Sequence, residues 1–254
     1  MVEQFKLLLA SVSFLSIIPT GMNRRLTGET LGRSATYFPV AGLVIGTFAL
    51  FFALALDKVF TAQAANALLI LYLAVVSGGL HLDALADTMD GFAGGKSKAQ
   101  RLKIMRQGAS GPFGVAAVTT VLLLKYAFLN SLAGPVRLLA LLTVPAMARW
   151  PMVWMAWRLP AVRHSGLGWL FTRRTRGIDV AGAGALTAGT SAYLSWLLGP
   201  AYLLLMPALV LLAVIGARVN KVFIGGATGD TLGAMVEISE VVLFMAINVL
   251  ARYA

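Results

Sequence analysis

The sequence predicts an all-α, polytopic integral membrane protein: a bundle of about six or seven transmembrane helices with an interfacial helix at the N-terminus. Hydrophobic residues fill 59% of the 254 positions and charged residues only 12%, and the mean hydropathy is +0.82. This composition is typical of membrane proteins. Apolar stretches recur along the whole chain, so we expect residues 1–254 to form a single membrane-embedded domain.

The elements follow from these apolar stretches. Residues 7–18 lie behind Glu3 and Lys6 without a clearly basic start or an A-x-A cleavage site, which favours a retained interfacial helix over a signal peptide. Windows of about 16–22 residues, near the length that spans a bilayer, lie at 37–56, 62–79, 113–133, 137–157, 180–198, 201–216 and 232–251. The 201–216 window is short, so residues 180–216 form either two tilted spans or one span and a re-entrant piece.

Basic residues precede the first window and follow the second, fourth and sixth. They are Lys6, Arg24, Arg25 and Arg33; Lys96, Lys98, Arg101, Lys103 and Arg106; Arg158, Arg163, Arg173, Arg174 and Arg176; and Arg218 and Lys221. The alternate loops hold only Lys58 and Arg137, with Arg252 near the C-terminal end. The positive-inside rule places the basic loops in the cytoplasm, which predicts a multi-pass inner-membrane protein and favours seven crossings.

The same rule explains the net charge of +11, with phosphate binding by the basic loops as the alternative. We expect the lipid bilayer as a partner and no nucleic acid, because the cations are spread over four loops rather than gathered beside stacking aromatics. The chain has no cysteine, which excludes disulfides, thiol catalysis and thiolate metal sites.

Three carboxylates gather in residues 78–91, GGLHLDALADTMDG. Asp83, Asp87 and Asp90 are spaced by four and three residues, so on a helix they share one face and repel one another unless a cation lies among them. His81 adjoins them, either as a proton carrier or phosphate contact or as a packing residue at the helix end.

A second acidic segment, GGATGDTLGAMVEISE at 225–240, contains Asp230, Glu237 and Glu240 on one helical face. The two glutamates reach into the last apolar window, where a carboxylate without a partner is costly. Salt bridges to nearby Arg or Lys are one explanation. Two oxygen-rich triads at a membrane boundary favour the other, which is a bound Mg²⁺ or Mn²⁺ ion.

Glycine pairs at 78–79 and 225–226 precede both triads. Glycine lets a backbone approach a phosphate closely, but it also lets helices pack closely, as expected at Gly42 and Gly46.

Two groups of cations bear on the same chemistry. Residues 96–107 have the pattern of an amphipathic cytoplasmic helix whose cations could hold a polyanion near the first triad. Lys125 and Arg149 lie inside apolar windows, and Arg149 pairs either with Glu237 or Glu240 or with a phosphate. A carboxylate-bound metal beside cations fits phosphoryl or nucleotidyl transfer.

Residues 78–91, 101–106 and 225–240 together resemble the signature segments of the cobalamin synthase family, the adenosylcobinamide-GDP ribazoletransferases. Weaker echoes lie at 14–19, 38–43, Arg149 and 166–168. The resemblance implies the last assembly step of cobalamin biosynthesis. In that step the ribose hydroxyl of α-ribazole, or of its 5′-phosphate, displaces GMP from adenosylcobinamide-GDP, with Mg²⁺ as cofactor. A homo-oligomer is left open.

The resemblance also suggests roles for single residues. The metal ligands would be Asp83, Asp87, Asp90 and Glu237. The catalytic residues would be Asp90, as the base, with Asp87 and His81. The substrate-binding residues would be Arg106, Arg149, Gly225, Gly226, Asp230 and Glu240.

The chain departs from the family pattern at two places. Ala84 stands where the family usually has glycine, and residues 107–109, Gln-Gly-Ala, stand where it commonly has Asp-Ser-Arg. Substrate preference is therefore in question, whereas both triads are intact.

Two other functions stay in view. One is a CDP-alcohol-type lipid phosphotransferase, although the arginine of its aspartate motif is missing here. The other is a cation transporter that uses the acids as ion sites.

Overall fold

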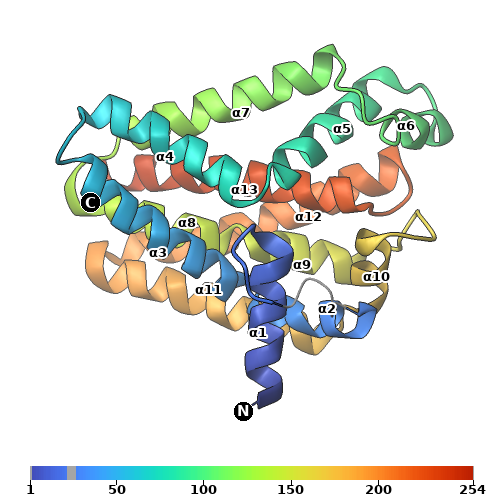
Figure 1. The fold of residues 1–254 in the computed structure, drawn as a ribbon, viewed down its shortest axis with the longest axis horizontal. Helices are drawn as coiled ribbons and strands as arrows, with labels where there is room; N and C mark the ends of the chain where they lie inside the picture. Colours follow the sequence, from blue (N-terminus) through green and yellow to red (C-terminus); the bar gives the residue numbers. More distant parts are fainter. Residues whose placement is uncertain (1, 22–26, 254) are drawn as a thin grey trace.

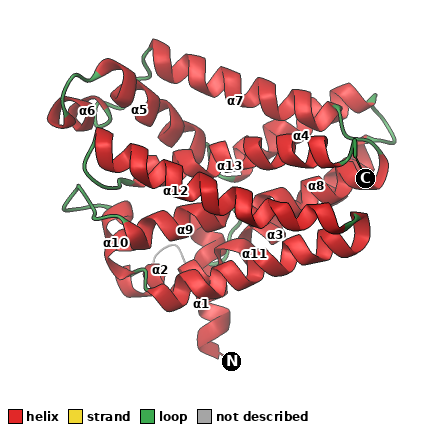
Figure 2. Cartoon of the chain, turned by 180° about the vertical axis from the view of Figure 1, so that it is seen from behind, coloured by secondary structure: helices red, strands yellow, loops and turns green. Residues whose placement is uncertain are grey.

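The computed structural model describes residues 2–21 and 27–253, most of them helical. Figures 1 and 2 show long helices running side by side, joined by short connections. Across these ranges the only β pairing is an isolated parallel bridge between Ala161 and Ala227. The expected all-α bundle is confirmed.

Within the described residues, five helical segments are long and apolar enough to cross a membrane. They are Gly28–Leu56, Pro112–Asn130, Gly134–Arg158, Pro200–Phe223 and Gly229–Leu250. They comprise α2 (Gly28–Ser34), η2 (Ala35–Tyr37), α3 (Phe38–Leu56), α7 (Pro112–Asn130), α8 (Gly134–Met147), α9 (Arg149–Arg158), η3 (Pro200–Leu204), α12 (Leu205–Phe223) and α13 (Gly229–Leu250). A sixth crossing is added if the bent pair α4 (Ala62–Val76) and α5 (Leu80–Gly94) counts as one span.

The seventh expected crossing, at 180–198, corresponds to α11 (Gly177–Leu198), which is 22 residues long. Its sequence is broken up by glycine, serine and threonine, and it is not among the described segments apolar enough to span a membrane. Length and composition alone therefore single out five or six crossings, and α11, which joins the end of α10 (Leu167–Arg174) to the start of η3 and α12, misses this criterion by composition. The open choice for residues 180–216 resolves into two separate helices, α11 and α12, joined by η3.

Helix α1 (Val2–Leu15) begins before the expected 7–18 segment and ends within it. Figure 1 shows it crossing the direction of the long helices and protruding from the bundle. It packs against α2 and α3, and Phe14 stacks on Phe38 with ring centroids 5.7 Å apart. A crosswise helix of this kind matches the expected interfacial helix.

Two consecutive glycines divide the expected 62–79 span into α4 and α5. Gly78 and Gly79 have φ values of 64° and 72°, a left-handed conformation that L side chains rarely adopt. Their N–H groups donate to the carbonyl oxygens of Val75 and Ala74 and so end α4. Helix α5 then leaves at 83° to α4. This glycine pair therefore makes a turn, and α5 carries the first acidic triad as a helix of its own.

Helix α13 lies in the middle of the bundle, with α4, α5 and α7 on one side and α8, α9 and α11 on the other (Figure 1). Helix α3 packs closely on α8, because Gly42 and Gly46 leave room for the backbone of Pro145 and Leu142. The short helices α6 (Lys98–Ile104) and α10 (Leu167–Arg174) lie at the end of the bundle where α5 ends and α13 begins (Figure 1). Both acidic segments therefore meet at one end of the molecule.

Candidate active site

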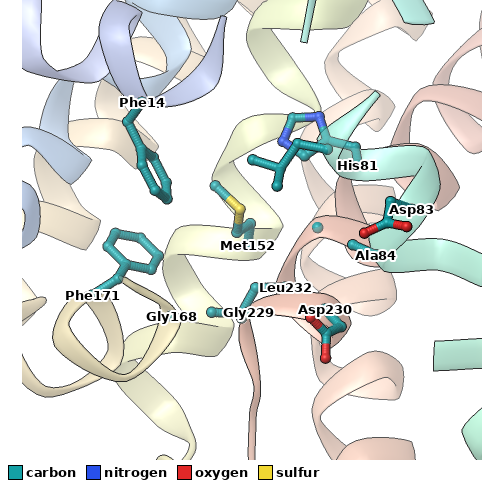
Figure 3. Close-up of a pocket in the computed structure, with 12 residues that line it drawn as sticks. Phe14, His81, Asp83, Ala84, Met152, Gly168, Phe171, Gly229, Asp230 and Leu232 are labelled. Carbon is teal, nitrogen blue, oxygen red and sulfur yellow. The ribbon is translucent and has the colours of Figure 1, made fainter. Parts of the chain in front are cut away.

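A cavity of about 140 Å³ lies among α1, α5, α9, α10 and α13 (Figure 3). It is lined by Phe14, Leu80, His81, Asp83, Ala84, Met152, Gly168, Phe171, Gly229, Asp230, Leu232 and Gly233. Figure 3 shows Phe14 and Phe171 on one side and His81 and Asp83 on the other, with Met152 between them. The cavity thus has a largely apolar wall and a polar edge.

A second cavity, of about 200 Å³, adjoins the first, since Gly168, Gly229 and Asp230 line both. Its other lining residues are Ala161, Arg163, Ser165, Gly166, Trp169, Ala227 and Thr228. Arg163 Nη2 lies 2.7 Å from Asp230 Oδ2, and the two side chains are 23% and 20% exposed. This ion pair is therefore open to a ligand.

We call Asp83, Asp87, Asp230 and Arg163 the open cluster. Asp87 lies within electrostatic range of the other three. In the described part of the chain the side chains of Asp83 and Asp87 have no ion pair or hydrogen bond, and both residues are at least partly exposed. Three carboxylates here face one guanidinium, so the cluster carries an excess of negative charge beside the cavities.

Asp90, the expected base and metal ligand, has a different place. Its carboxylate accepts hydrogen bonds from the backbone N–H groups of Gly111 (2.6 Å) and Gly114 (2.8 Å), at the start of α7. The side chain is buried. Asp90 therefore caps α7, because a carboxylate satisfies the free N–H groups and the partial positive charge of a helix start. The structure thus gives Asp90 a structural contact, whereas its expected roles as base and metal ligand stay predictions.

Glu237, Glu240, Arg149 and Lys125 form a second group, the inner cluster. Lys125 Nζ lies 2.6 Å from Glu237 Oε2 and 2.6 Å from Glu240 Oε2. Arg149 Nη1 lies 2.5 Å from Glu240 Oε1 and donates to the Pro145 carbonyl oxygen at 2.7 Å. All four side chains are 2–4% exposed. Buried carboxylates need such partners.

The inner cluster contains three of the residues expected at the site. Glu237 is paired with a lysine rather than placed to bind a metal. Glu240 and Arg149 are paired with each other rather than placed to bind substrate. The sequence left open whether Arg149 pairs with a glutamate or with a phosphate, and in the structure it forms a salt bridge with Glu240.

Arg106 is exposed just beyond α6, outside the residues that line the two cavities. Gly225 has a φ of 89° and makes a turn. Gly226 packs against the Pro160 carbonyl, and the neighbouring Ala227 donates to it at 2.9 Å. This second glycine pair thus holds the 160–163 segment beside the start of α13.

His81 lines the first cavity and is only 3% exposed. Its imidazole makes no hydrogen bond within the described residues. Of the expected site residues, the first cavity therefore brings together His81, Asp83 and Asp230, and Asp87 lies within electrostatic range of the two aspartates. On its other side His81 lies within electrostatic range of Arg149 and Glu240. Asp90, Arg106, Arg149, Glu237 and Glu240 line neither cavity.

Within the described residues, no three His, Cys, Asp or Glu side chains form a ready-made metal site. The expected four-ligand set of Asp83, Asp87, Asp90 and Glu237 is therefore not assembled. Two of its members are used elsewhere, Asp90 by α7 and Glu237 by Lys125. The other two remain free carboxylates on the exposed side of α5.

Sequence reasoning missed Arg163 and the apolar wall of the first cavity. Arg163 was only one cation of a basic loop, and the bridge between Ala161 and Ala227 that places it has no local signal. The signal for the wall was weak but present, since Phe14 and Gly168 lie in segments that echo the family. Gly168 allows α10 to touch the backbone of Gly229.

Comparison with known proteins covers almost the whole chain. Residues 7–248 match the family model described as CobS, cobalamin-5-phosphate synthase. An adenosylcobinamide-GDP ribazoletransferase of Roseiflexus sp. (strain RS-1) is 34% identical over 95% of this chain and 88% of its own length. The enzyme of the same name from Pseudomonas paraeruginosa is 35% identical over 96% of this chain and 98% of its own length. The enzyme of the same name from Caldanaerobacter subterraneus subsp. tengcongensis is 31% identical over 98% of this chain and 100% of its own length. No solved structure matches.

Proposed function

The chain belongs to the cobalamin-5-phosphate synthase family, and from this premise we propose that its two cavities and open cluster form the active site of an adenosylcobinamide-GDP ribazoletransferase. A ribose hydroxyl of α-ribazole, or of its 5′-phosphate, forms a bond to the phosphorus that carries adenosylcobinamide. The bond from that phosphorus to GMP breaks, and the hydroxyl proton passes to a base. The products are adenosylcobalamin, or its 5′-phosphate, and GMP, which completes cobalamin assembly.

The observation that carries the assignment to this site is the open cluster at the junction of an apolar and a polar cavity. The apolar cavity accepts the aromatic base of ribazole, because Phe14, Met152 and Phe171 offer it flat or polarisable surfaces. The polar cavity accepts the phosphates of the nucleotide, because Arg163 can donate to phosphate oxygens in a bidentate manner. The ribose hydroxyl then lies at the shared edge, near Asp83 and Asp230.

Mg²⁺ is part of the proposal, held by the carboxylates of Asp83 and Asp87 together with phosphate oxygens of the substrate. Mg²⁺ usually takes only one or two protein carboxylates and completes its shell with water and phosphate. Two unpaired carboxylates therefore fit the ion, although the described residues hold no cluster of three. When bound, the ion would neutralise charge on the phosphoryl group.

His81 is the proton acceptor in this proposal. Its imidazole lines the first cavity and is free of other hydrogen bonds within the described residues. Asp90 is not available for this role, since both of its oxygens accept from the start of α7. Asp230 stays paired with Arg163 and keeps the guanidinium at the edge of the polar cavity.

We place the active site on the cytoplasmic side of an inner membrane. Both cavities are lined by α10 and by the start of α13. These elements lie with α6 at one end of the bundle (Figure 1), where the basic loops gather, and the positive-inside rule puts such loops in the cytoplasm. The lipid phosphotransferase and the cation transporter gain no support from the comparisons, which match a transferase family over residues 7–248.

The test is GMP release by the detergent-purified protein given adenosylcobinamide-GDP and α-ribazole, with Mg²⁺ or with a chelator. Asp87→Asn should lower turnover by about 100-fold or more, because an amide is a poor Mg²⁺ ligand. The matched control is Glu29→Gln, an exposed acid that lines neither cavity, which should keep full turnover.

Each result has a separate meaning. No GMP release by the unaltered, folded protein would overturn the reaction itself. Normal turnover by Asp87→Asn would overturn the open cluster as its site, and release that is insensitive to chelator would overturn the role of the metal.

A further inference from the structure

A groove lies between the ends of α9 and α12, away from the two cavities of the active site. Its volume is about 390 Å³, and it is lined by Trp154, Arg158, Leu159, Pro160, Val214, Ala217, Arg218 and Lys221. Val214, Ala217, Arg218 and Lys221 recur at helical spacing on one face of α12, and Trp154 and Arg158 are one turn apart on α9. We call these eight residues the basic groove.

Three cations converge in the basic groove without a counter-ion. Arg158, Arg218 and Lys221 have no ion pair or hydrogen bond within the described residues, and no carboxylate lines the groove. Elsewhere in the described chain six cations each contact a carboxylate: Arg33, Lys125, Arg137, Arg149, Arg163 and Arg176. Other cations, such as Lys58 and Lys103, also lack such a contact, so what sets these three apart is that they line one groove. Three like charges in one groove repel one another, so an anion bound there would be stabilised by all three.

The surface beside the groove indicates what kind of anion fits. Leu211, Ile215, Arg218 and Val222 follow one another at steps of four, three and four residues, so they form one stripe along α12. The apolar members are exposed, Leu211 by 61%, Ile215 by 48% and Val222 by 69%. Because α12 belongs to a segment long and apolar enough to span a membrane, acyl chains would cover this stripe.

We propose that the basic groove binds the headgroup of an anionic phospholipid, with an acyl chain lying along the exposed stripe of α12. Arginine donates to two phosphate oxygens at once, lysine adds a point charge, and tryptophan favours the headgroup level of a bilayer. Basic pockets between helix ends are known to hold such headgroups. A soluble anion would use the cations but leave the apolar stripe without a partner.

The experiment is native mass spectrometry of the full chain in detergent, titrated with phosphatidylglycerol, with phosphatidylethanolamine or with glycerol 3-phosphate. The groove variant is R158Q/R218Q/K221Q. The matched control is K6Q/K96Q/K103Q, which removes the same charge from exposed positions outside the groove. We expect one tightly held phosphatidylglycerol, an apparent affinity lowered on the order of 100-fold in the groove variant, and no change in the control.

Three results would overturn the proposal. Equal loss in the groove and control variants would mean that only overall positive charge attracts the lipid. Equal binding of phosphatidylethanolamine would mean that the headgroup charge is not recognised. Binding of glycerol 3-phosphate as tight as that of phosphatidylglycerol would mean a site for soluble anions. The charge-preserving R158K/R218K variant should keep most of the binding, which separates loss of charge from loss of fold.

Discussion

The open cluster and the inner cluster share helix α13, and both combine carboxylates with cations, yet they have opposite surroundings. Helix α13 supplies Asp230 to the first and Glu237 and Glu240 to the second. In the inner cluster two carboxylates meet two cations and all are 2–4% exposed. In the open cluster three carboxylates meet one cation beside two cavities. An acid in a membrane helix therefore indicates a ligand site only when the fold leaves it short of partners.

The largest expected effect comes from breaking the inner cluster. Lys125→Met leaves two buried glutamates with a single arginine, and loss of one partner from a buried ion pair typically costs about 3–5 kcal/mol of unfolding free energy. We expect a large fall in the thermal unfolding temperature in detergent. Lys58→Met, at an exposed lysine between α3 and α4, is the control. An unchanged unfolding temperature in Lys125→Met would contradict the structural role of the cluster.

An intermediate effect is expected from the cation of the open cluster. Arg163→Gln removes charged hydrogen bonds to phosphate, worth about 1.5–3 kcal/mol, and should lower kcat/KM for adenosylcobinamide-GDP about 10- to 100-fold with little effect on folding. The KM for α-ribazole should stay the same. Arg252→Gln is the control, because Arg252 is exposed and lines neither cavity. Equal losses for both substrates would argue against a nucleotide contact.

The smallest effect on turnover is expected for a substitution of Asp90. Comparing it with a substitution of Asp87 separates the roles of these two neighbours on α5. Asp90→Asn keeps one acceptor oxygen for the start of α7 and should cost about 1 kcal/mol of stability, while turnover stays within several-fold. Asp87→Asn should show the reverse, with stability kept and turnover lost. Thermal unfolding and GMP release measured side by side test the pair. If Asp90→Asn lost as much turnover as Asp87→Asn, Asp90 would have to act in the active site.

The fold was largely predictable because hydropathy and charge patterns depend on short-range composition. The windows near α3, α7 and α13 and the packing at Gly42 and Gly46 agree with the structure. The number of crossings was less predictable, since α11 is long enough to span but too rich in small and hydroxyl residues to meet the test of composition.

The site was predictable only in part, because spacing shows which residues share a helical face but not what lies opposite. Asp83 and Asp90 share a face of α5, yet only Asp90 meets the start of α7. Glu237 and Glu240 have the same ambiguity, and it is resolved by Lys125, more than a hundred positions away in the chain. Arg163 depends on a bridge between two loops and leaves no trace in the local pattern.

The cap that Asp90 places on α7 has a consequence for how the protein can change. Asp90 joins α5 to Gly111 and Gly114, and Met105 is buried against Gly91, so the exposed residues 106–110 form a short loop with both ends fixed. The entropic cost of closing such a loop grows only slowly with its length, so this loop can gain, lose or exchange residues at little thermodynamic cost. The Gln-Gly-Ala stretch at 107–109 lies within it. Evolution could therefore change what this loop recognises without disturbing the helices that carry the site residues.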